Sequence, residues 1–411
     1  MIDAPYTLFT RIPLYADADG AVHADDLWAK DLACHLTYIQ DFRICCPLLP
    51  MAACPDNAVV VTGLSQAQVI PVARDRGWLS VLRNLVPNFL QVRRAVKHSR
   101  IVHSGGAGWA FPLSYYVLLL RPFLTFQWIM VIESSFWMKP DRGPVSLRQR
   151  LSHMLHSRLV RACVRAADAH IFTQSWYRDL FLPPEVPAHV APAVWIDAED
   201  ILDTEAHAAR QPKRSDGPAR LIFPARLVPE KGVETVLKAI EAFERRHEGQ
   251  DIPAPLLQVD LMGAGALAAM CRNFADQPRR AVQVRFLEQV AYGPPFFELI
   301  GEYEALLVAN QQPEQPRIIF DAFSQALPVI ATRTPGIETC LEQDRTGWLF
   351  DVDDSAALAD LFERAIAQPQ VLADMGAWAC DAVSTWTHAR MHQNREVFLK
   401  TRLNLAAQEN C

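Results

Sequence analysis

Two basic residues, Arg226 and Lys231, follow a short apolar stretch, and Gly232 comes directly after them. The sequence LIFPARLVPEKGVETVLKAI predicts a buried strand, a loop that carries both cations, and a helix that begins at Gly232. Cations at the carboxyl end of a parallel strand, beside the positive N-terminus of a helix, form a site for a phosphate or a diphosphate. The alternative is a pair of solvated loop cations, and the sequence further along the chain favours the phosphate site.

The second group of candidate residues lies in the segment NQQPEQPRIIFDAFSQALPVIATRTPGIETCLEQDRTGWLF, which contains the acids Glu314 and Asp321. Together with the first loop, this segment resembles the donor-binding half of the retaining nucleotide-sugar glycosyltransferases of group 1 type, including bacterial cell-envelope and exopolysaccharide enzymes. The matching positions, in chain order, are Arg226-Leu227, Lys231-Gly232, Asp321-Ala322-Phe323-Ser324, Pro328-Val329-Ile330, Gly336 and Gly347-Trp348-Leu349. Each motif alone is weak, but the ordered set is specific.

This resemblance implies an α/β protein with the GT-B fold, in which two Rossmann-like domains face each other across a cleft. By the same resemblance, a nucleotide-sugar co-substrate binds the C-terminal domain, and its sugar is transferred with retention of configuration. Arg226 and Lys231 would then hold the diphosphate, Asp321 the ribose hydroxyls, and Glu314 the transferred sugar. Gly263 and Gly336 would line the donor site, with Arg226, Lys231 and Glu314 as the catalytic group. No tightly bound cofactor is implied.

The chain departs from the family pattern in the same region. Ala225 and Ala326 stand where glycines are usual, and Glu314 and Asp321 are seven positions apart rather than eight, with Pro313 at the usual position. Without a family role, Glu314 is a surface acid in a proline-flanked loop and Asp321 a charge near a helix N-terminus. These departures leave open a non-catalytic subunit that keeps the fold for binding or as a scaffold.

A third interpretation comes from VDLMGAGALAAM, where Gly263, Gly265 and Ala268 follow a buried strand and Glu288 comes about twenty residues later. This pattern is typical of dinucleotide-binding proteins and would indicate an NAD-dependent oxidoreductase. However, the fingerprint normally lies on the first strand of its domain, whereas the loop with Arg226 and Lys231 comes before it here. We therefore rank this interpretation below the transferase.

In the N-terminal half, two loops follow apolar strands and are candidates for acceptor binding. One carries Gly105, Gly106 and Trp109, and the other begins with Glu133. Both are expected at the carboxyl ends of parallel strands, where ligands bind in open α/β sheets. The alternatives are a plain tight turn and an internally paired acid; His103 is expected to be a satisfied core residue. The acceptor implied by the resemblance is a glycan or a lipid-linked glycan.

These residues require two α/β domains to position them. Apolar runs alternate with helical periodicity from Ala219 onward, in the strands ARLIFP, LLQVDLM, VQVRFLE, EALLVAN, PVIAT and GWLF. A looser series of the same kind precedes them: YTLFTRI, FRICC, AVVVTG, RIVH, FQWIMVIE and AHIFTQ. We expect an acceptor domain over 1–203, a linker over 204–218, a donor domain over 219–385, and a C-terminal helix over 386–411 that crosses back to the first domain.

Composition narrows the partners. The chain has 411 residues, a net charge of -6 and nine scattered cysteines without a C-x-x-C pair, which favours a cytosolic protein and excludes nucleic acid as an expected partner. The N-terminus lacks a signal-peptide pattern, and Arg121-Pro122 divides the longest apolar stretch. No motif indicates a metal site, so a divalent ion would be held mainly by donor phosphates, and the need for one stays open.

Charge is distributed unevenly along the chain. Residues 91–165 contain twelve basic residues against two acidic ones. Within them, LRQRLSHMLHSRLVRACVR predicts a helix with Leu147, Leu151, Met154, Leu155 and Val160 roughly along one side. Such a basic helix suits anionic lipid headgroups, and hence a peripheral position at the inner face of a membrane. The alternative is a solvated helix whose leucines pack on the sheet.

Overall fold

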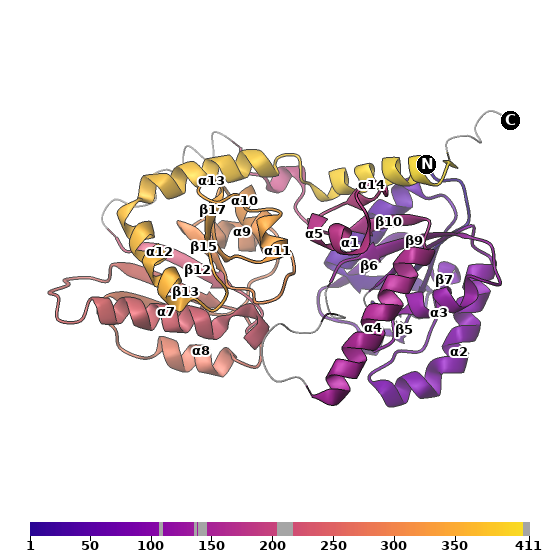
Figure 1. The fold of residues 1–411 in the computed structure, drawn as a ribbon, viewed down its shortest axis with the longest axis horizontal. Coiled ribbons are helices and arrows are strands. Elements are labelled where there is room, and N and C mark those ends of the chain that lie inside the picture. The colour runs from indigo at the N-terminus through magenta and orange to yellow at the C-terminus, as the bar shows by residue number, and fades with distance from the viewer. Residues whose placement is uncertain (107–109, 135–137, 139–145, 204–216, 406–411) are drawn as a thin grey trace. The chain divides into compact units, whose positions relative to one another are not determined.

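The computed structural model describes residues 1–106, 110–134, 138, 146–203 and 217–405. The chain forms two compact units: unit 1 comprises Met1–Ala193 with Ala389–Cys411, and unit 2 comprises Val194–His388 (Figure 1). Most of the predicted linker, 204–218, lies outside the described residues. Unit 2 begins before it because Val194 and Ile196 are buried in the core of that unit.

Unit 2 is built on a six-stranded parallel sheet in the order β14-β13-β12-β15-β16-β17. The strands are β12 (Ala219–Pro224), β13 (Leu257–Met262), β14 (Val282–Leu287), β15 (Ala305–Val308), β16 (Val329–Thr332) and β17 (Gly347–Phe350). All six correspond to predicted apolar runs. Such runs are continuous because helices bury both faces of a parallel sheet.

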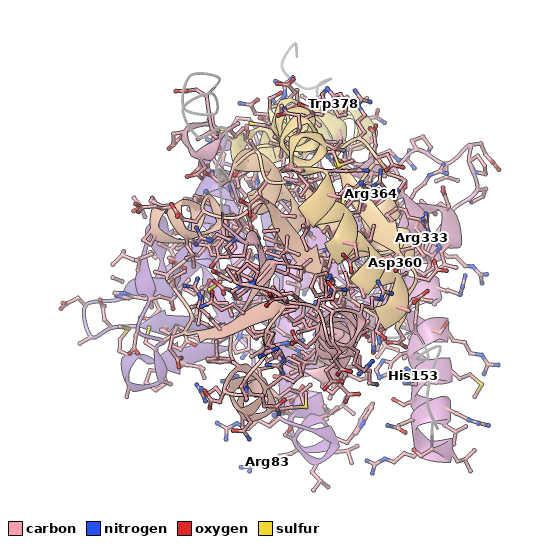
Figure 2. The ribbon with its side chains drawn as sticks, turned by 90° about the vertical axis from the view of Figure 1, so that its left-hand side faces the viewer. Arg83, His153, Arg333, Asp360, Arg364 and Trp378 are labelled. Carbon is pink, nitrogen blue, oxygen red and sulfur yellow. The ribbon has the colours of Figure 1, made fainter. Side chains whose placement is uncertain are left out.

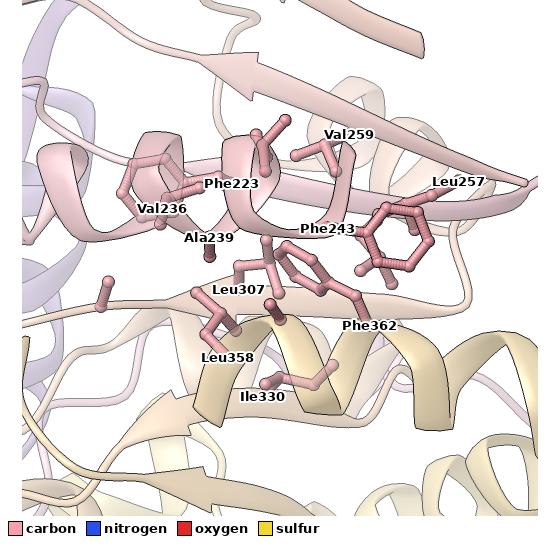
Figure 3. Packing of buried hydrophobic residues seen from close by; sticks show 14 of the residues in the cluster. Phe223, Val236, Ala239, Phe243, Leu257, Val259, Leu307, Ile330, Leu358 and Phe362 are labelled. Atoms are coloured by element: carbon pink, nitrogen blue, oxygen red, sulfur yellow. The ribbon is translucent and has the colours of Figure 1, made fainter. Parts of the chain in front are cut away.

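Helices cover both faces of this sheet. They are α7 (Val233–Arg246), α8 (Ala268–Ala275), α9 (Pro294–Ile300), α10 (Ile318–Ser324), α11 (Pro335–Glu338), α12 (Ser355–Ala367) and α13 (Pro369–Val383), with short 3-10 turns at η3 (Ala198–Asp200) and η4 (Pro229–Lys231). On one face, Phe243 of α7 and Phe362 of α12 pack on Leu257 and Leu307 of the sheet (Figure 3). Helices α9 and α10 pack on the other face, where alternate strand residues such as Ile222 point.

Unit 1 contains two sheets rather than the single parallel series that the sequence predicts. The larger is parallel, with the order β11-β10-β9-β8-β1-β4-β7, and the smaller has the order β5-β2-β3-β6. The strands are β1 (Tyr6–Phe9), β2 (Leu14–Ala16), β3 (Ala21–Asp25), β4 (Phe42–Cys46), β5 (Leu48–Pro50), β6 (Ala58–Ser65), β7 (Val69–Pro71), β8 (Ile101–Gly105), β9 (Gln127–Ile132), β10 (Ala169–Phe172) and β11 (His189–Val190).

The prediction for AVVVTG was wrong in its setting: β6 pairs antiparallel with β3 in the smaller sheet. Only Val61 and Leu64 of β6 are buried, so the apolar run belongs to a largely solvated strand. Strands β2 and β3 form around the turn that contains Gly20, which adopts a positive φ of 83°. Neither strand is among the apolar runs from which the strands were predicted.

The helices of unit 1 are α1 (Asp26–Tyr38), α2 (Trp78–Lys97), α3 (Leu113–Leu120), α4 (Leu147–Ala166), α5 (Ser175–Phe181) and, from Ala389 onward, α14 (His388–Arg402), with 3-10 turns η1 (Met51–Ala53) and η2 (Gln66–Gln68). Asp25 caps α1, accepting a hydrogen bond from the backbone N–H of Trp28 at 3.1 Å. Leu399 of α14 and Leu403, which follows the helix, are buried in the core formed by the N-terminal strands. The C-terminal helix is therefore part of unit 1.

A buried polar cluster joins α1 to α14. Asp31 receives a hydrogen bond from His392 Nε2 at 3.0 Å, and the Arg395 guanidinium lies 3.1 Å from His35 Nε2. Because a guanidinium only donates, His35 Nε2 accepts and the ring is neutral, which leaves Nδ1 to donate to the Asp31 carbonyl at 2.9 Å. Burial lowers the pKa of His392 to about 3, against the opposing effect of its bond to Asp31. This cluster holds neutral histidines together with the Asp31 carboxylate and the Arg395 guanidinium.

The predicted face of α4 is divided in the structure. Val160 is buried against the sheet, whereas Leu147, Leu151, Met154 and Leu155 are exposed. At about 100° per residue, Val160 lies on the opposite side of the helix from Leu151, so one apolar side was the wrong grouping. Among the helices in the described ranges, none combines the length and apolar character that a membrane crossing requires.

Candidate functional site

The loop between β12 and α7 carries the first pair of candidate cations. Lys231 ends the turn η4, Gly232 adopts a positive φ of 70°, and α7 begins at Val233. This is the predicted strand, loop and helix, with the helix start shifted by one residue. Arg226 is exposed, with 67% of its side-chain surface accessible, and Lys231 is half-buried.

Lys231 connects this loop to the loop after β15. Its Nζ lies 3.9 Å from Oε2 of Glu314, while Nη2 of Arg226 lies 3.4 Å from Oε1 of Glu230. Burial lowers the pKa of the Lys231 amine; Glu314 opposes that effect and the positive charge of Arg226 adds to it. The structure therefore brings Glu314 to Arg226 and Lys231, which lie much earlier in the sequence.

Arg317 is a third cation at this position, and the sequence analysis did not single it out. It is the N-cap residue of α10, and its charge also lowers the pKa of Lys231. Its guanidinium carbon lies 5.3 Å from the ring centroid of Trp195. The signal was present in the sequence, since Arg317 lies between the two candidate acids. Its neighbourhood with Lys231 depends on the pairing of β12 with β15.

Glycines allow the loops of this site to pack backbone against backbone. A Cβ on Gly232 would lie 2.0 Å from the Ala309 carbonyl oxygen, and a Cβ on Gly336 would lie 2.4 Å from the backbone of Glu314. A Cβ on Gly263 would lie 1.9 Å from the carbonyl oxygen of Ala225. The loops after β12, β13, β15 and β16 are thereby fixed against one another, and each of these glycines has a packing role.

Asp321 lies inside the unit, with 6% of its surface exposed. Its Oδ1 accepts a hydrogen bond of 2.8 Å from the hydroxyl of Tyr292, which precedes α9. Burial and the charge of Asp321 raise the pKa of Tyr292, so the phenol stays protonated and donates. Tyr292 was not predicted from the sequence, because its meeting with Asp321 results from the packing of α9 on α10.

In unit 1, the structure brings two of the candidate loops together. Gly105 ends β8 opposite Val131 of β9, and the N–H of Gly106 donates to the Val131 carbonyl at 2.7 Å. Glu133 follows β9 at the same edge and is exposed. Trp109 lies outside the described residues.

His103, on β8, is buried and hydrogen-bonded to the Tyr6 hydroxyl at 2.6 Å. It is thus the satisfied core residue that the sequence predicts.

One group of side chains in unit 1 has the composition of a metal site: Asp31, His35 and His392 present ligand atoms within 4.8 Å of one another. The guanidinium of Arg395, however, lies 3.1 Å from His35 Nε2. A permanent buried cation at this distance opposes a metal ion and already uses the histidine lone pair. The cluster is therefore better described as a structural network.

Comparisons with known proteins agree with this geometry. Residues 218–368 match the family of group 1 glycosyl transferases. A D-inositol 3-phosphate glycosyltransferase of Corynebacterium diphtheriae is 25% identical over 182 residues, 43% of this chain, and one of Corynebacterium jeikeium is 26% identical over 160 residues, 38% of this chain. The matches span 41% and 37% of the lengths of these two relatives.

Solved structures show the same architecture over the whole chain. Anabaena HepE in complex with UDP and glucose superposes with a TM-score of 0.64 at 13% identity, covering 97% of this chain and all of that one. Sucrose-phosphate synthase of Thermosynechococcus elongatus gives a TM-score of 0.67 at 16% identity, with 98% of this chain and 100% of that one covered. The chain thus has the GT-B fold, and its residues 218–368 match the model of the group 1 glycosyl transferases.

Proposed function

We propose that the protein is a glycosyltransferase that moves a sugar from a nucleotide-sugar donor to a glycan or lipid-linked glycan. The observation that carries this proposal is the gathering of Arg226, Lys231 and Arg317 at the carboxyl ends of β12 and β15. Two acids lie beside these three cations, Glu314 at Lys231 and Glu230 at Arg226, so the loops carry excess positive charge. A diphosphate supplies the matching negative charge.

The donor we propose is a UDP-sugar. In its support, the similar HepE structures contain UDP, UDP with glucose, or UDP-glucose. When the bond from sugar to diphosphate breaks, negative charge accumulates on the departing oxygen. Cations already held in place, as Lys231 is by half-burial, stabilise that charge without rearrangement.

Retention of configuration and the roles of the acids belong to the same proposal. Glu314 would contact the sugar, and the position of its carboxylate beside Lys231 supports this role. Asp321, which accepts a hydrogen bond from Tyr292, would bind the ribose hydroxyls, and Gly263 and Gly336 would shape the donor site by packing its loops. We assign no covalent nucleophile, so the chain would act by positioning and charge stabilisation.

Specific observations bear on the two competing interpretations, an NAD-dependent oxidoreductase and a scaffold subunit. Gly263 and Gly265 pack against the backbone of Ala225 and Leu227, which explains these glycines without a dinucleotide. A scaffold subunit was suggested by Ala225 and Ala326. Ala225 is not among the residues with positive φ, so this backbone tolerates alanine; Ala326 has φ 51° and adopts a conformation that glycine prefers. Only the second substitution has a conformational cost.

Unit 1 would receive the acceptor at Gly105, Gly106 and Glu133, with Trp109 as a further candidate. A cytoplasmic location, peripheral at the inner face of the membrane, is part of the proposal. Any divalent ion would be held mainly by the donor phosphates.

The test is sugar release or transfer from a panel of UDP-, GDP- and ADP-sugars, followed by chromatography. Glu314→Gln should lower turnover at least about tenfold with little change in affinity for the nucleoside diphosphate, because a contact strengthened in the transition state affects rate. Asp321→Asn should instead weaken nucleotide binding. Glu241→Gln, which neutralises an exposed acid of α7 paired with Arg245, serves as the matched control. Donor binding without turnover by the unmodified chain, on every sugar and with added Mg²⁺, would support the scaffold subunit.

A further inference from the structure

Helices α2 and α4 share an unusual arrangement of apolar side chains. On α2, Val81, Asn88 and Val92 are buried, while a second stripe is exposed on the other side: Leu79, Leu82, Val86 and Leu90. At about 100° per residue the two stripes lie roughly opposite each other. Leu79 is 87% exposed. The outward stripe of α2 is therefore not part of the core of unit 1.

Helix α4 repeats this arrangement. Its buried residues are His156, Val160, Cys163 and Val164, and the apolar residues of its first half point the other way: Leu147, Leu151, Met154 and Leu155. Leu147 is 73% exposed. Figure 2 shows side chains of α4 projecting outward around the labelled His153. Single exposed apolar residues are common on protein surfaces and need no explanation. Here the exposed apolar residues recur with the helical period on two helices, which calls for one.

The two helices belong to one layer. Helix α3 packs against both of them, and the ring of Trp78, at the start of α2, lies 6.0 Å from the ring of His156 in the middle of α4. His156 is fixed in turn by the Tyr115 hydroxyl of α3 at 2.8 Å. Figure 1 shows α2, α3 and α4 together in unit 1. We name the outward apolar stripes of α2 and α4, with their neighbouring cations, the α2–α4 surface.

The charge on these helices has one sign. Neither α2 nor α4 contains an Asp or a Glu, and together they carry nine cations: Arg83, Arg93, Arg94, Lys97, Arg148, Arg150, Arg158, Arg161 and Arg165. The helical period places Arg83, Arg93 and Lys97 beside the exposed stripe of α2. On α4, Arg158 and Arg165 continue the line of the exposed leucines. Apolar side chains flanked by cations, with no acid, are the composition of a helix that lies in a membrane interface.

We propose that the α2–α4 surface docks the protein on a membrane that contains anionic lipids, with the leucines entering the acyl boundary and the arginines binding headgroup phosphates. Charge complementarity decides the occupant. A second copy that used the same surface would bring two sets of like cations together, which repel. The inference deepens the proposed function, because an enzyme docked on a membrane would meet a lipid-linked acceptor there. Only this link to the acceptor rests on the proposed function.

The test is co-sedimentation of the full chain with phosphatidylcholine vesicles, with and without phosphatidylglycerol. Binding should require phosphatidylglycerol and weaken between 0.1 M and 1 M salt, since screening shortens from about 10 Å to about 3 Å. The triple variant Leu147→Ser, Leu151→Ser, Met154→Ser should lower the partition coefficient at least about tenfold. Arg148→Gln with Arg158→Gln should lower it by about fivefold per charge.

Matched controls lie on other exposed helix positions. Val397→Ser removes an exposed apolar side chain from α14 of the same unit, and Arg245→Gln removes a cation from α7; both should leave binding unchanged. Equal binding to neutral vesicles, or full binding by the triple serine variant, would overturn the proposal. So would a concentration-dependent dimer, seen in sedimentation velocity, that the triple variant abolishes.

The same variants are also assayed for UDP binding, which separates the two proposals. Loss of vesicle binding with normal UDP affinity concerns the α2–α4 surface alone. If the unmodified chain binds vesicles as described but binds no nucleotide, the donor proposal fails while the surface stands.

Discussion

The two units hold neighbouring elements together by different kinds of contact. In unit 2, glycines let the backbones of neighbouring loops touch, as Gly232 does at Ala309 and Gly336 at Glu314. In unit 1, the helices α1 and α14 are joined through Asp31, His392 and Arg395, which are buried and hydrogen-bonded. The stability of unit 2 should therefore depend on keeping side chains out of its glycine contacts. The stability of unit 1 should depend on the protonation of its buried polar cluster.

The largest effect should come from Gly232→Ala in unit 2. The new Cβ would meet the Ala309 carbonyl oxygen at 2.0 Å, and the residue would keep a φ of 70°. Left-handed backbone and overpacking together cost about 2–4 kcal/mol of the free energy of unfolding. Gly249→Ala is the matched control, since Gly249 has φ 79° but no neighbour within 4 Å. Equal losses of melting temperature in both variants would show that loop contact has no part in the effect.

Acidification should act on unit 1. Burial lowers the pKa of His103 well below its ordinary value and that of His392 to about 3. The unfolded chain then binds more protons below about pH 6.5, so the stabilising contribution is complete above that pH and is lost as pH falls. Each histidine that is still neutral at pH 5 should account for about 2 kcal/mol of lost stability there.

Limited proteolysis at falling pH, with the cleavage sites mapped by mass spectrometry, measures this effect in each unit. Cleavage should begin in unit 1. His392→Gln keeps a donor toward Asp31 and an acceptor toward Tyr38, and should reduce the pH dependence of the melting temperature. His98→Gln, at an exposed position after α2, should not change it. First cleavage within 217–388 would contradict the assignment of the acid-sensitive groups.

A smaller and equal effect is expected at one helix cap in each unit. Asp25 accepts a hydrogen bond from Trp28 N at the start of α1, and Asp354 accepts one from Ala357 N at the start of α12. Asp25→Ala and Asp354→Ala should each cost about 1 kcal/mol of unfolding free energy. The asparagine variants should recover most of the loss in chemical denaturation. No recovery by asparagine would mean that net charge rather than capping is responsible.

The smallest predicted effect is stabilising. Ala326 adopts φ 51°, a conformation that costs a residue with a Cβ about 1–2 kcal/mol of folding free energy. Glycine avoids this cost, but its greater freedom in the unfolded chain costs about 0.5–1 kcal/mol on folding. Ala326→Gly should therefore raise the free energy of unfolding by about 0.5 kcal/mol, measurable as a higher denaturation midpoint. A lower midpoint would mean that the buried methyl group contributes more than the backbone conformation costs.

The sheet of unit 2 could be predicted because its central strands, such as β15 and β16, are continuous apolar runs buried on both faces. In unit 1 the same reasoning failed for Leu14–Ala16 and Ala21–Asp25, which are short strands without an apolar run. Periodicity also grouped Val160 with Leu151, because two opposite apolar stripes on one helix cannot be assigned to core and solvent without the neighbouring elements.

The candidate site could be predicted only in part, for a similar reason. Arg226, Lys231 and Glu314 have positions that follow from strand order and loop motifs. Arg317 lies near Lys231, and Tyr292 donates a hydrogen bond to Asp321. The partners in each pair are separated in the sequence, and packing between helices and loops brings them together in space.

The central claim is that the loops of unit 2 hold a diphosphate, and calorimetric titration of UDP and of uridine tests it most directly. Lys231→Ala should weaken UDP binding by at least about tenfold, as expected for loss of a charged hydrogen bond, and leave uridine binding nearly unchanged. Lys238→Ala, an exposed lysine on α7 paired with Glu234, should change neither. Equal UDP affinity in the unmodified chain and in Lys231→Ala, or equal weakening of UDP and uridine, would contradict the account.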